Sequence, residues 1–135
     1  MLRLENSDRD VDRKALRGPT NETVELAREV HKDYGNFGIL LDEGHFPLMK
    51  EDPEKSLEMP KGLLTHIHMG NCYSKDSSKS HFGDKQLAFG IPDSDVGLEE
   101  LKVFLRKLKE IGFFGKNCAT KLPVISFEVN LGKNR

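Results

Sequence analysis

Four short apolar runs in this chain each end in a side chain that can bind a metal ion. The runs are Leu-Arg-Leu-Glu5, Gly-Ile-Leu-Leu-Asp42, Thr-His-Ile-His68 and Ile-Ser-Phe-Glu128. Acidic residues often end strands because loops begin there, so one such residue alone indicates little. Three carboxylates and an imidazole together indicate a site for one divalent ion, for which Mn²⁺, Mg²⁺, Co²⁺ and Zn²⁺ are all chemically suitable. Carboxylates grouped in a poorly solvated pocket need such a cation, or protons, to offset their repulsion.

The apolar runs are predicted to be β-strands, at residues 1–4, 37–41, 63–67 and 124–127. None of them alternates strictly between apolar and polar residues, which indicates strands that are buried on both faces of a parallel sheet. In parallel α/β sheets and barrels, the carboxyl ends of the strands face the functional site. The four residues that end the runs should therefore converge on one point.

Helices are predicted between the strands, because apolar residues recur there at helical spacing. The predicted helices cover residues 20–34, 53–59 and 98–111, the second of them short. Thr20 and Asp95 are the expected N-caps of the two long helices, and Gly112 is expected to end the last one. Strands that alternate with helices predict an α/β fold with a parallel sheet, here as a single domain over residues 1–135.

Two further histidines are candidates for contact with a substrate. His66 and His68 are two residues apart, so their side chains point to the same side of a strand. His68 is the better metal ligand, and His66 is expected to be a hydrogen-bonded neighbour of the site. His45 lies in the segment after Asp42, where it could hydrogen-bond either a substrate hydroxyl or the loop backbone. The long segment 70–95 is predicted to be a functional or mobile loop.

Composition and charge argue against several classes of function. Lys and Arg number 21 against 22 Asp and Glu, and the two signs are interspersed, so nucleic acid is not an expected partner. No apolar stretch approaches the ~20 residues that span a bilayer, and the start of the chain lacks the features of a signal peptide, so we expect a cytoplasmic protein without a membrane segment. Cys72 and Cys118 lie far apart, which predicts neither a disulfide framework nor a zinc knuckle.

Several groups of residues form a combined pattern over nearly the whole chain. They are Leu-Glu5, Asp42-Glu-Gly-His45, His66-Ile-His68-Met-Gly-Asn71, Phe82-Gly-Asp84 with Phe89-Gly90, and Ser126-Phe-Glu128-Val. This pattern resembles the xylose-isomerase-like family of sugar isomerases and epimerases, which includes ketose 3-epimerases. The resemblance implies a (β/α)₈ TIM barrel, of which this chain would supply about four βα units with the last four strands.

The resemblance also implies roles for individual residues. One divalent ion would be held by Glu5, Asp42, His68 and Glu128. Glu5 and Glu128 would also form the acid/base pair, while His45 and His66 would contact a small sugar or sugar phosphate. A metal that polarises a carbonyl and stabilises the developing enediolate makes the neighbouring proton removable. Two carboxylates on opposite faces of the sugar then allow the proton to leave from one side and return on the other.

Two departures from the family pattern bear on function. Ketose 3-epimerases carry an Arg shortly after the metal-bound His, whereas this chain has Lys75, so the sugar is left open. A full barrel of this type needs roughly 250 residues, and this chain has 135. We therefore expect either a truncated reading frame or a half-barrel that completes itself as a homodimer, because a lone half would expose two edge strands and an apolar interior.

Two alternative functions stay open at the level of the sequence. A metal-dependent hydrolase or endonuclease could use the same barrel, although it would normally need more histidine ligands and a basic groove. The chain could also be a non-catalytic barrel fragment that binds metal or sugar without turnover.

Overall fold

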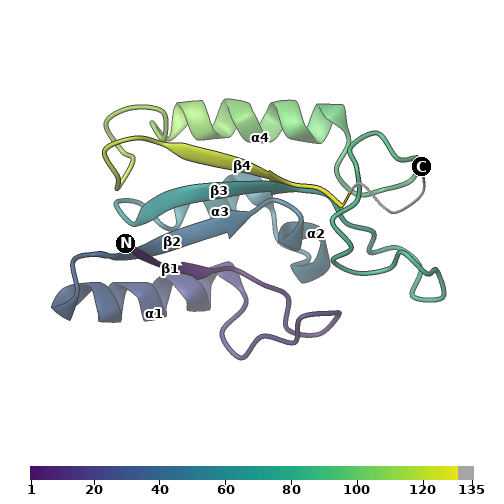
Figure 1. Cartoon of the computed structure of the whole chain (residues 1–135), viewed down its shortest axis with the longest axis horizontal. Coiled ribbons are helices and arrows are strands. Elements are labelled where there is room, and N and C mark those ends of the chain that lie inside the picture. The colour runs from purple at the N-terminus through teal and green to yellow at the C-terminus, as the bar shows by residue number, and fades with distance from the viewer. Residues whose placement is uncertain (131–135) are drawn as a thin grey trace.

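The computed structural model describes residues 1–130 as a parallel sheet with helices against it. In chain order the elements are β1 (Leu2–Glu5), α1 (Thr20–Asp33), β2 (Phe37–Asp42), α2 (His45–Met49), α3 (Pro53–Glu58), β3 (Leu64–Gly70), α4 (Leu98–Glu110) and β4 (Val124–Glu128). The strands lie side by side in the order β1-β2-β3-β4, and every pair is parallel. The predicted α/β class is therefore confirmed. All arrows point the same way in Figure 1, and the long segments that follow β1 and β3 leave from that end.

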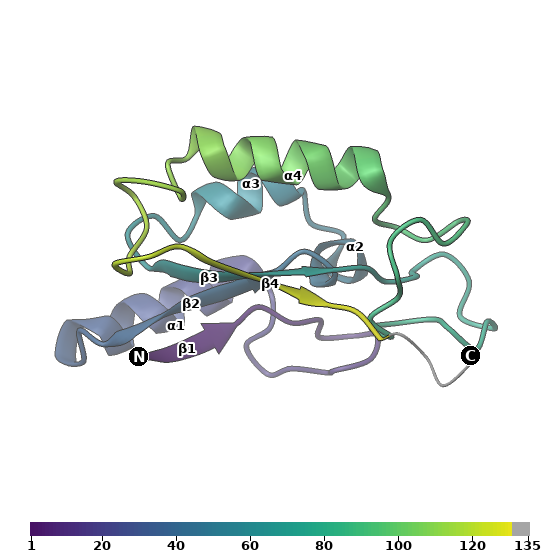
Figure 2. The same ribbon diagram turned by 45° about the horizontal axis from the view of Figure 1, so that its top comes forward.

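The hydrophobic core lies between the sheet and its helices. Ile39, Leu41 and Ile67 of the central strands are fully buried. They belong to one cluster with Ala27 of α1 and with Leu108 of α4. Figure 2 shows α3 and α4 together on one side of the sheet. The amphipathic helices predicted from the sequence thus bury their apolar faces as expected.

The two edge strands are much more exposed than the two central strands. Leu2 of β1 and Phe127 of β4 are each 67% exposed, whereas the residues of β2 and β3 are buried with few exceptions. The prediction that all four strands are buried on both faces is wrong for β1 and β4. Within residues 1–130 each of them pairs with a neighbouring strand on one side only, so its other edge is left without a strand partner.

The face of the sheet that turns away from the helices is polar. Side chains alternate along a strand, so Asp42 and His68 lie on the face opposite Leu41 and Ile67. His66 also lies on this polar face, where it hydrogen-bonds Ser126 of β4. The expectation of an exposed apolar interior is therefore wrong, because the candidate ligands and their partners occupy that face. The exposed apolar side chains of the sheet lie on its edge strands instead.

The long helices begin differently from their predicted caps. Pro19 precedes α1, and Thr20 is the first helical residue, whose N–H donates to Glu51. α4 starts after Gly97, whose N–H donates to the side chain of Glu100. Asp95 instead accepts hydrogen bonds from the N–H and hydroxyl of Ser74, which lies far away in the sequence. Local spacing could not reveal these partners.

The last helix ends where the sequence predicted. Gly112 follows the C-cap residue Ile111 and has a φ of +79°, a left-handed conformation that favours glycine.

The segment between β3 and α4 is tied to the body of the protein by Asn71. The Asn71 side chain donates to Ala88 O and Ser94 Oγ and accepts from the N–H of Val96. Asn71 itself is almost fully buried. One side chain thus fixes both the middle and the end of a segment that the sequence shows only as a long loop. No helix among residues 1–130 is long and apolar enough to cross a membrane.

Candidate metal centre

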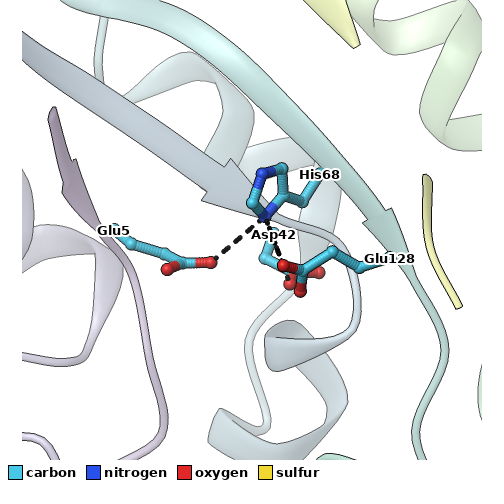
Figure 3. Close-up of side chains that lie close together, drawn as sticks. All are labelled: Glu5, Asp42, His68 and Glu128. Carbon is cyan, nitrogen blue, oxygen red and sulfur yellow. Dashed lines mark ion pairs between the residues drawn. The ribbon is translucent and has the colours of Figure 1, made fainter. Parts of the chain in front are cut away.

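The four residues that end the apolar runs come together at the carboxyl end of the sheet (Figure 3). One ligand atom from each of Glu5, Asp42, His68 and Glu128 lies within 4.8 Å of the others. Nδ1 of His68 is 3.4 Å from Oε1 of Glu5 and 3.3 Å from Oε1 of Glu128. The same nitrogen is 4.0 Å from Oδ2 of Asp42. The convergence predicted from the sequence is therefore present in the fold.

Strand register explains why the outer two residues of the cluster are glutamates. Asp42 and His68 lie directly opposite each other in the β2–β3 ladder. Glu5 pairs with Leu40, two residues short of Asp42, and Glu128 pairs with Gly70, two residues beyond His68. Two residues along a strand correspond to roughly 6–7 Å. The longer glutamate side chains close this offset from the two edge strands.

Asp42 is held in place by backbone and side-chain hydrogen bonds. Its N–H donates to Oδ1 of the buried Asn6 at 2.7 Å, and its Oδ1 accepts from the N–H of Gly44 at 2.8 Å. Gly70 on β3 permits this placement, because a Cβ at that position would lie only 2.9 Å from Oδ1. Asn6 is a site residue that the sequence did not indicate, since nothing local distinguishes it from an ordinary loop asparagine.

The imidazole of His68 is oriented toward the three carboxylates but makes no hydrogen bond with them. Its buried Nδ1 has no hydrogen-bond partner among the described residues, although two carboxylates lie within 3.5 Å. The ring of His66 stacks edge-on against it at 4.8 Å, and Nε2 of His66 is 2.8 Å from Oγ of Ser126. Buried polar atoms are normally paired. An unpaired nitrogen surrounded by carboxylate oxygens matches the donor set of a divalent cation.

The electrostatics of the cluster lead to the same assignment. Burial raises the pKa of Asp42 to about 8, and repulsion from Glu128 and Glu5 adds to this effect, while the hydrogen bond from Gly44 opposes it. Burial also raises the pKa of Glu5, where the charge of Glu128 adds to the effect and His45 and His68 oppose it. Carboxylates held together in this way are destabilised as anions unless a cation is present. The residues therefore fit a divalent metal ion.

His45 lies beside the cluster on the short helix α2, which the sequence did not predict. It is 3% exposed, and its Nε2 is 3.9 Å from Oδ2 of Asp42 and 4.0 Å from Oδ2 of Asp84. Its buried Nδ1 has no hydrogen-bond partner among residues 1–130.

The segments after β1 and β3 meet beside the cluster. Arg13 forms a 2.7 Å ion pair with Asp84, and the Asp84 carboxylate is buried. Lys85 pairs with Asp12 at 2.8 Å. Gln86 donates to Oε2 of Glu128 at 3.1 Å and so helps to position that glutamate. In the sequence, Asp84 was noted only as part of the Phe82-Gly-Asp84 motif. No pattern in the sequence predicted that Gln86 would contact Glu128.

Asp8 organises the segment that follows Glu5. Its two carboxylate oxygens accept from the backbone N–H groups of Val11, Asp12 and Arg13 at 2.7–2.9 Å. Burial alone would raise the pKa of Asp8, but these hydrogen bonds and the charge of His45 lower it below its ordinary value. The carboxylate form of Asp8 therefore stabilises the folded protein.

Comparison with known proteins supports the fold. No family model matches the chain, and no curated protein matches it either. A solved structure of D-psicose 3-epimerase from Clostridium cellulolyticum H10, with D-tagatose, superposes with a TM-score of 0.59 at 18% sequence identity. The match covers 98% of this chain but only 36% of that one, so the chain spans about a third of its neighbour's length. The chain thus has the fold of part of a TIM barrel.

Replacing Asp8 with asparagine tests its role in the segment after Glu5. Asp8→Asn is expected to lower the free energy of unfolding by about 1–3 kcal/mol near neutral pH, because backbone N–H groups lose a charged acceptor. A group with a lowered folded-state pKa contributes stability above its unfolded pKa and loses it as the pH falls. The difference between wild type and variant should therefore shrink below about pH 4.

Urea unfolding at several pH values measures this difference. Asp10→Asn is the matched control, because Asp10 is exposed and accepts none of these three bonds. A difference for Asp8→Asn that stays constant from neutral to acidic pH would contradict the assignment.

Proposed function

We propose that this chain carries the metal-binding and proton-transfer residues of a divalent-metal-dependent isomerase or epimerase that acts on a sugar or sugar phosphate. The observation that carries the proposal is the convergence of one imidazole nitrogen and three carboxylates at the strand ends. In this proposal Glu5, Asp42, His68 and Glu128 hold one ion, which is Mn²⁺, Mg²⁺, Co²⁺ or Zn²⁺.

The arrangement of the glutamates suits proton transfer between two faces of a substrate. Glu5 comes from one edge strand and Glu128 from the other, and they flank His68 (Figure 3). When bound, the ion would supply positive charge that makes a proton next to a carbonyl acidic. One glutamate can then accept this proton from one face, while the other returns a proton to the opposite face. Their side chains are 42% and 31% exposed, so a substrate could reach both.

Two histidines are proposed to contact the substrate beside the ion. His45 is nearly buried and has an unpaired Nδ1. His66 lies on the polar face of the sheet and shares a hydrogen bond with Ser126, which fixes its ring. A sugar hydroxyl is an appropriate partner for either ring, because a hydroxyl can both donate and accept.

The structural neighbour supports a sugar as the substrate class, since that protein is a D-psicose 3-epimerase with D-tagatose bound. The particular sugar is left open. The stretch after His68 contains Lys75 but no arginine, and Lys75 donates to the backbone oxygen of Asp93 at 2.7 Å. A multi-metal hydrolase or endonuclease agrees less well with the site, because the cluster contains a single imidazole and one group of ligand atoms.

Metal binding is the first prediction from this proposal. Calorimetric titration of Mn²⁺ into chelator-treated protein is expected to show one site per chain. Glu128→Gln and His68→Ala should each weaken binding by about tenfold or more, because each removes a ligand. Glu29→Gln is the matched control, since that exposed carboxylate lies on α1 and pairs with Lys32. Unchanged Mn²⁺ affinity in both ligand variants would refute the assignment.

Turnover is the second prediction. The protein with Mn²⁺ should convert at least one member of a panel of ketoses to its epimer or isomer, as followed by NMR in D₂O. Deuterium should enter at the carbon next to the carbonyl, because the transferred proton exchanges with solvent. Glu5→Gln is expected to lower the rate by about 10²-fold or more, as for loss of an acid/base group. Tight metal binding without turnover on the whole panel would instead support the non-catalytic reading.

We further propose that residues 1–135 form one domain and that two copies complete a barrel. Both edges of the sheet are unpaired within residues 1–130, and two four-stranded sheets would supply the eight strands of a closed barrel. In a two-fold dimer, β4 of each copy would lie beside β1 of the other.

Light scattering tests the dimer. The expected mass is twice the 15.3 kDa of one chain. Leu2→Lys places a charge on the exposed edge strand β1 and should shift the protein toward monomer. Leu16→Lys is the control, because Leu16 is 90% exposed in the segment after β1 and lies outside the strand. A wild-type monomer at high concentration would rule out this assembly.

A further inference from the structure

We propose that the cavity between α2, α3 and α4 binds a primary ammonium group on a short aliphatic chain, with Glu43 as its counter-ion. This site is distinct from the metal centre and does not rest on the proposed sugar chemistry.

Glu43 has a buried side-chain carboxyl group, one oxygen of which has no partner among residues 1–130. Its side chain is almost completely buried, with the residue 3% exposed. Its Oε2 has no hydrogen-bond partner, and no basic side chain forms an ion pair with it among residues 1–130. Its backbone N–H donates to His68 O, which fixes the main chain at this point. Leaving such a group unpaired is costly, so the structure indicates that a donor belongs there.

Glu43 lines a cavity of about 440 Å³. Pro47 on α2 and Pro53 on α3 form part of its wall. Val103 and Phe104 of α4 face it from the other side. A volume of this size is in the range of small-molecule sites. Glu5, His68 and Glu128 are not among its lining residues, so a ligand here would not occupy the metal centre.

The cavity is strongly acidic. Its lining contains seven acidic residues and no Lys, Arg or His: Glu43, Glu51, Asp52, Glu54, Asp95, Glu99 and Glu100. Most of them already have partners within the protein. Glu51 accepts from Thr20 and Ser56, Asp95 accepts from Ser74, and Glu99 pairs with Lys102. Their charge attracts a cation to the cavity, while Glu43 is left to contact it directly.

The walls favour an organic cation over a bare metal ion. Ca²⁺ takes six or more oxygen ligands, and Mg²⁺ requires near-ideal octahedral geometry. Here the carboxylates of Asp52 and Glu100 cap the starts of α3 and α4. Val96, Val103 and Phe104 present apolar surface instead. An alkylammonium ion can place its three N–H donors at Glu43 and its methylene groups against Phe104.

Two sources could supply this chemistry: a free alkylamine or the lysine side chain of a peptide. The test is an NMR titration of ¹⁵N-labelled full-length protein with n-butylammonium chloride, at constant ionic strength and with saturating Mg²⁺ present. The amides of Glu43, Val103 and Phe104 should shift and saturate. n-Butanol, which has the same chain without the charge, should cause no saturable shift. Nα-acetyl-lysine N-methylamide is titrated in parallel, and the tighter of the two amines identifies the source.

Glu43→Gln keeps the shape of the side chain and removes its charge. It should weaken n-butylammonium binding by about tenfold or more, as expected for loss of a charge-assisted contact. Its Mn²⁺ binding should persist, which separates this site from the metal centre. Glu25→Gln is the matched control, because Glu25 is an exposed carboxylate on α1.

Three results would overturn the proposal. The first is that neither amine causes a saturable shift. The second is that Glu43→Gln binds n-butylammonium as tightly as the wild type. The third is that shifts are confined to the amides of Glu5, His68 and Glu128. Because the readout is at the cavity amides, it stays interpretable even if the proposed sugar chemistry fails.

Discussion

The repulsion among three carboxylates around one imidazole nitrogen is the constraint on which the rest of the site depends. Nδ1 of His68 lies 3.3–4.0 Å from an oxygen of each carboxylate and bonds to none of them. Such a group is stable in a folded protein only if a cation or bound protons offset the repulsion. A divalent ion bound where the four side chains meet would supply the positive charge. The same ion would also make a neighbouring substrate proton acidic, so one interaction links the stability of the site to its proposed chemistry.

The parallel sheet brings these groups together through its register. Asp42 and His68 stand opposite each other on central strands, while Glu5 and Glu128 reach in from the edges. Asp42 is buried and is held by hydrogen bonds to Asn6 and Gly44, while His68 is partly buried. The edge glutamates are more exposed and have longer side chains. This division suits their proposed roles, because ligands that also move protons must reach both the ion and the substrate.

Sequence patterns could predict the parts of this structure that depend on near neighbours in the chain. Apolar runs located the four strands, and the residue at each strand end located the cluster. The caps of α1 and α4 were predicted wrongly, because Thr20 is already the first helical residue after Pro19, and Asp95 bonds to Ser74, which is distant in sequence. The exposure of β1 and β4 was also missed. The burial of a strand depends on which elements lie beside it in the fold. The sequence of an apolar run does not show whether it will be a central strand or an edge strand.

The contacts between the two long segments explain how an open sheet can hold its edge glutamates in register. In a closed barrel, strand pairing would fix the distance between the first and last strands. Here Arg13 pairs with Asp84, and Lys85 with Asp12, so the segment after β1 is joined to the segment after β3. Gln86 then donates to Glu128. These contacts run from one edge of the sheet to the other beside the cluster, and they allow a single chain to assemble all four candidate ligands without further strands.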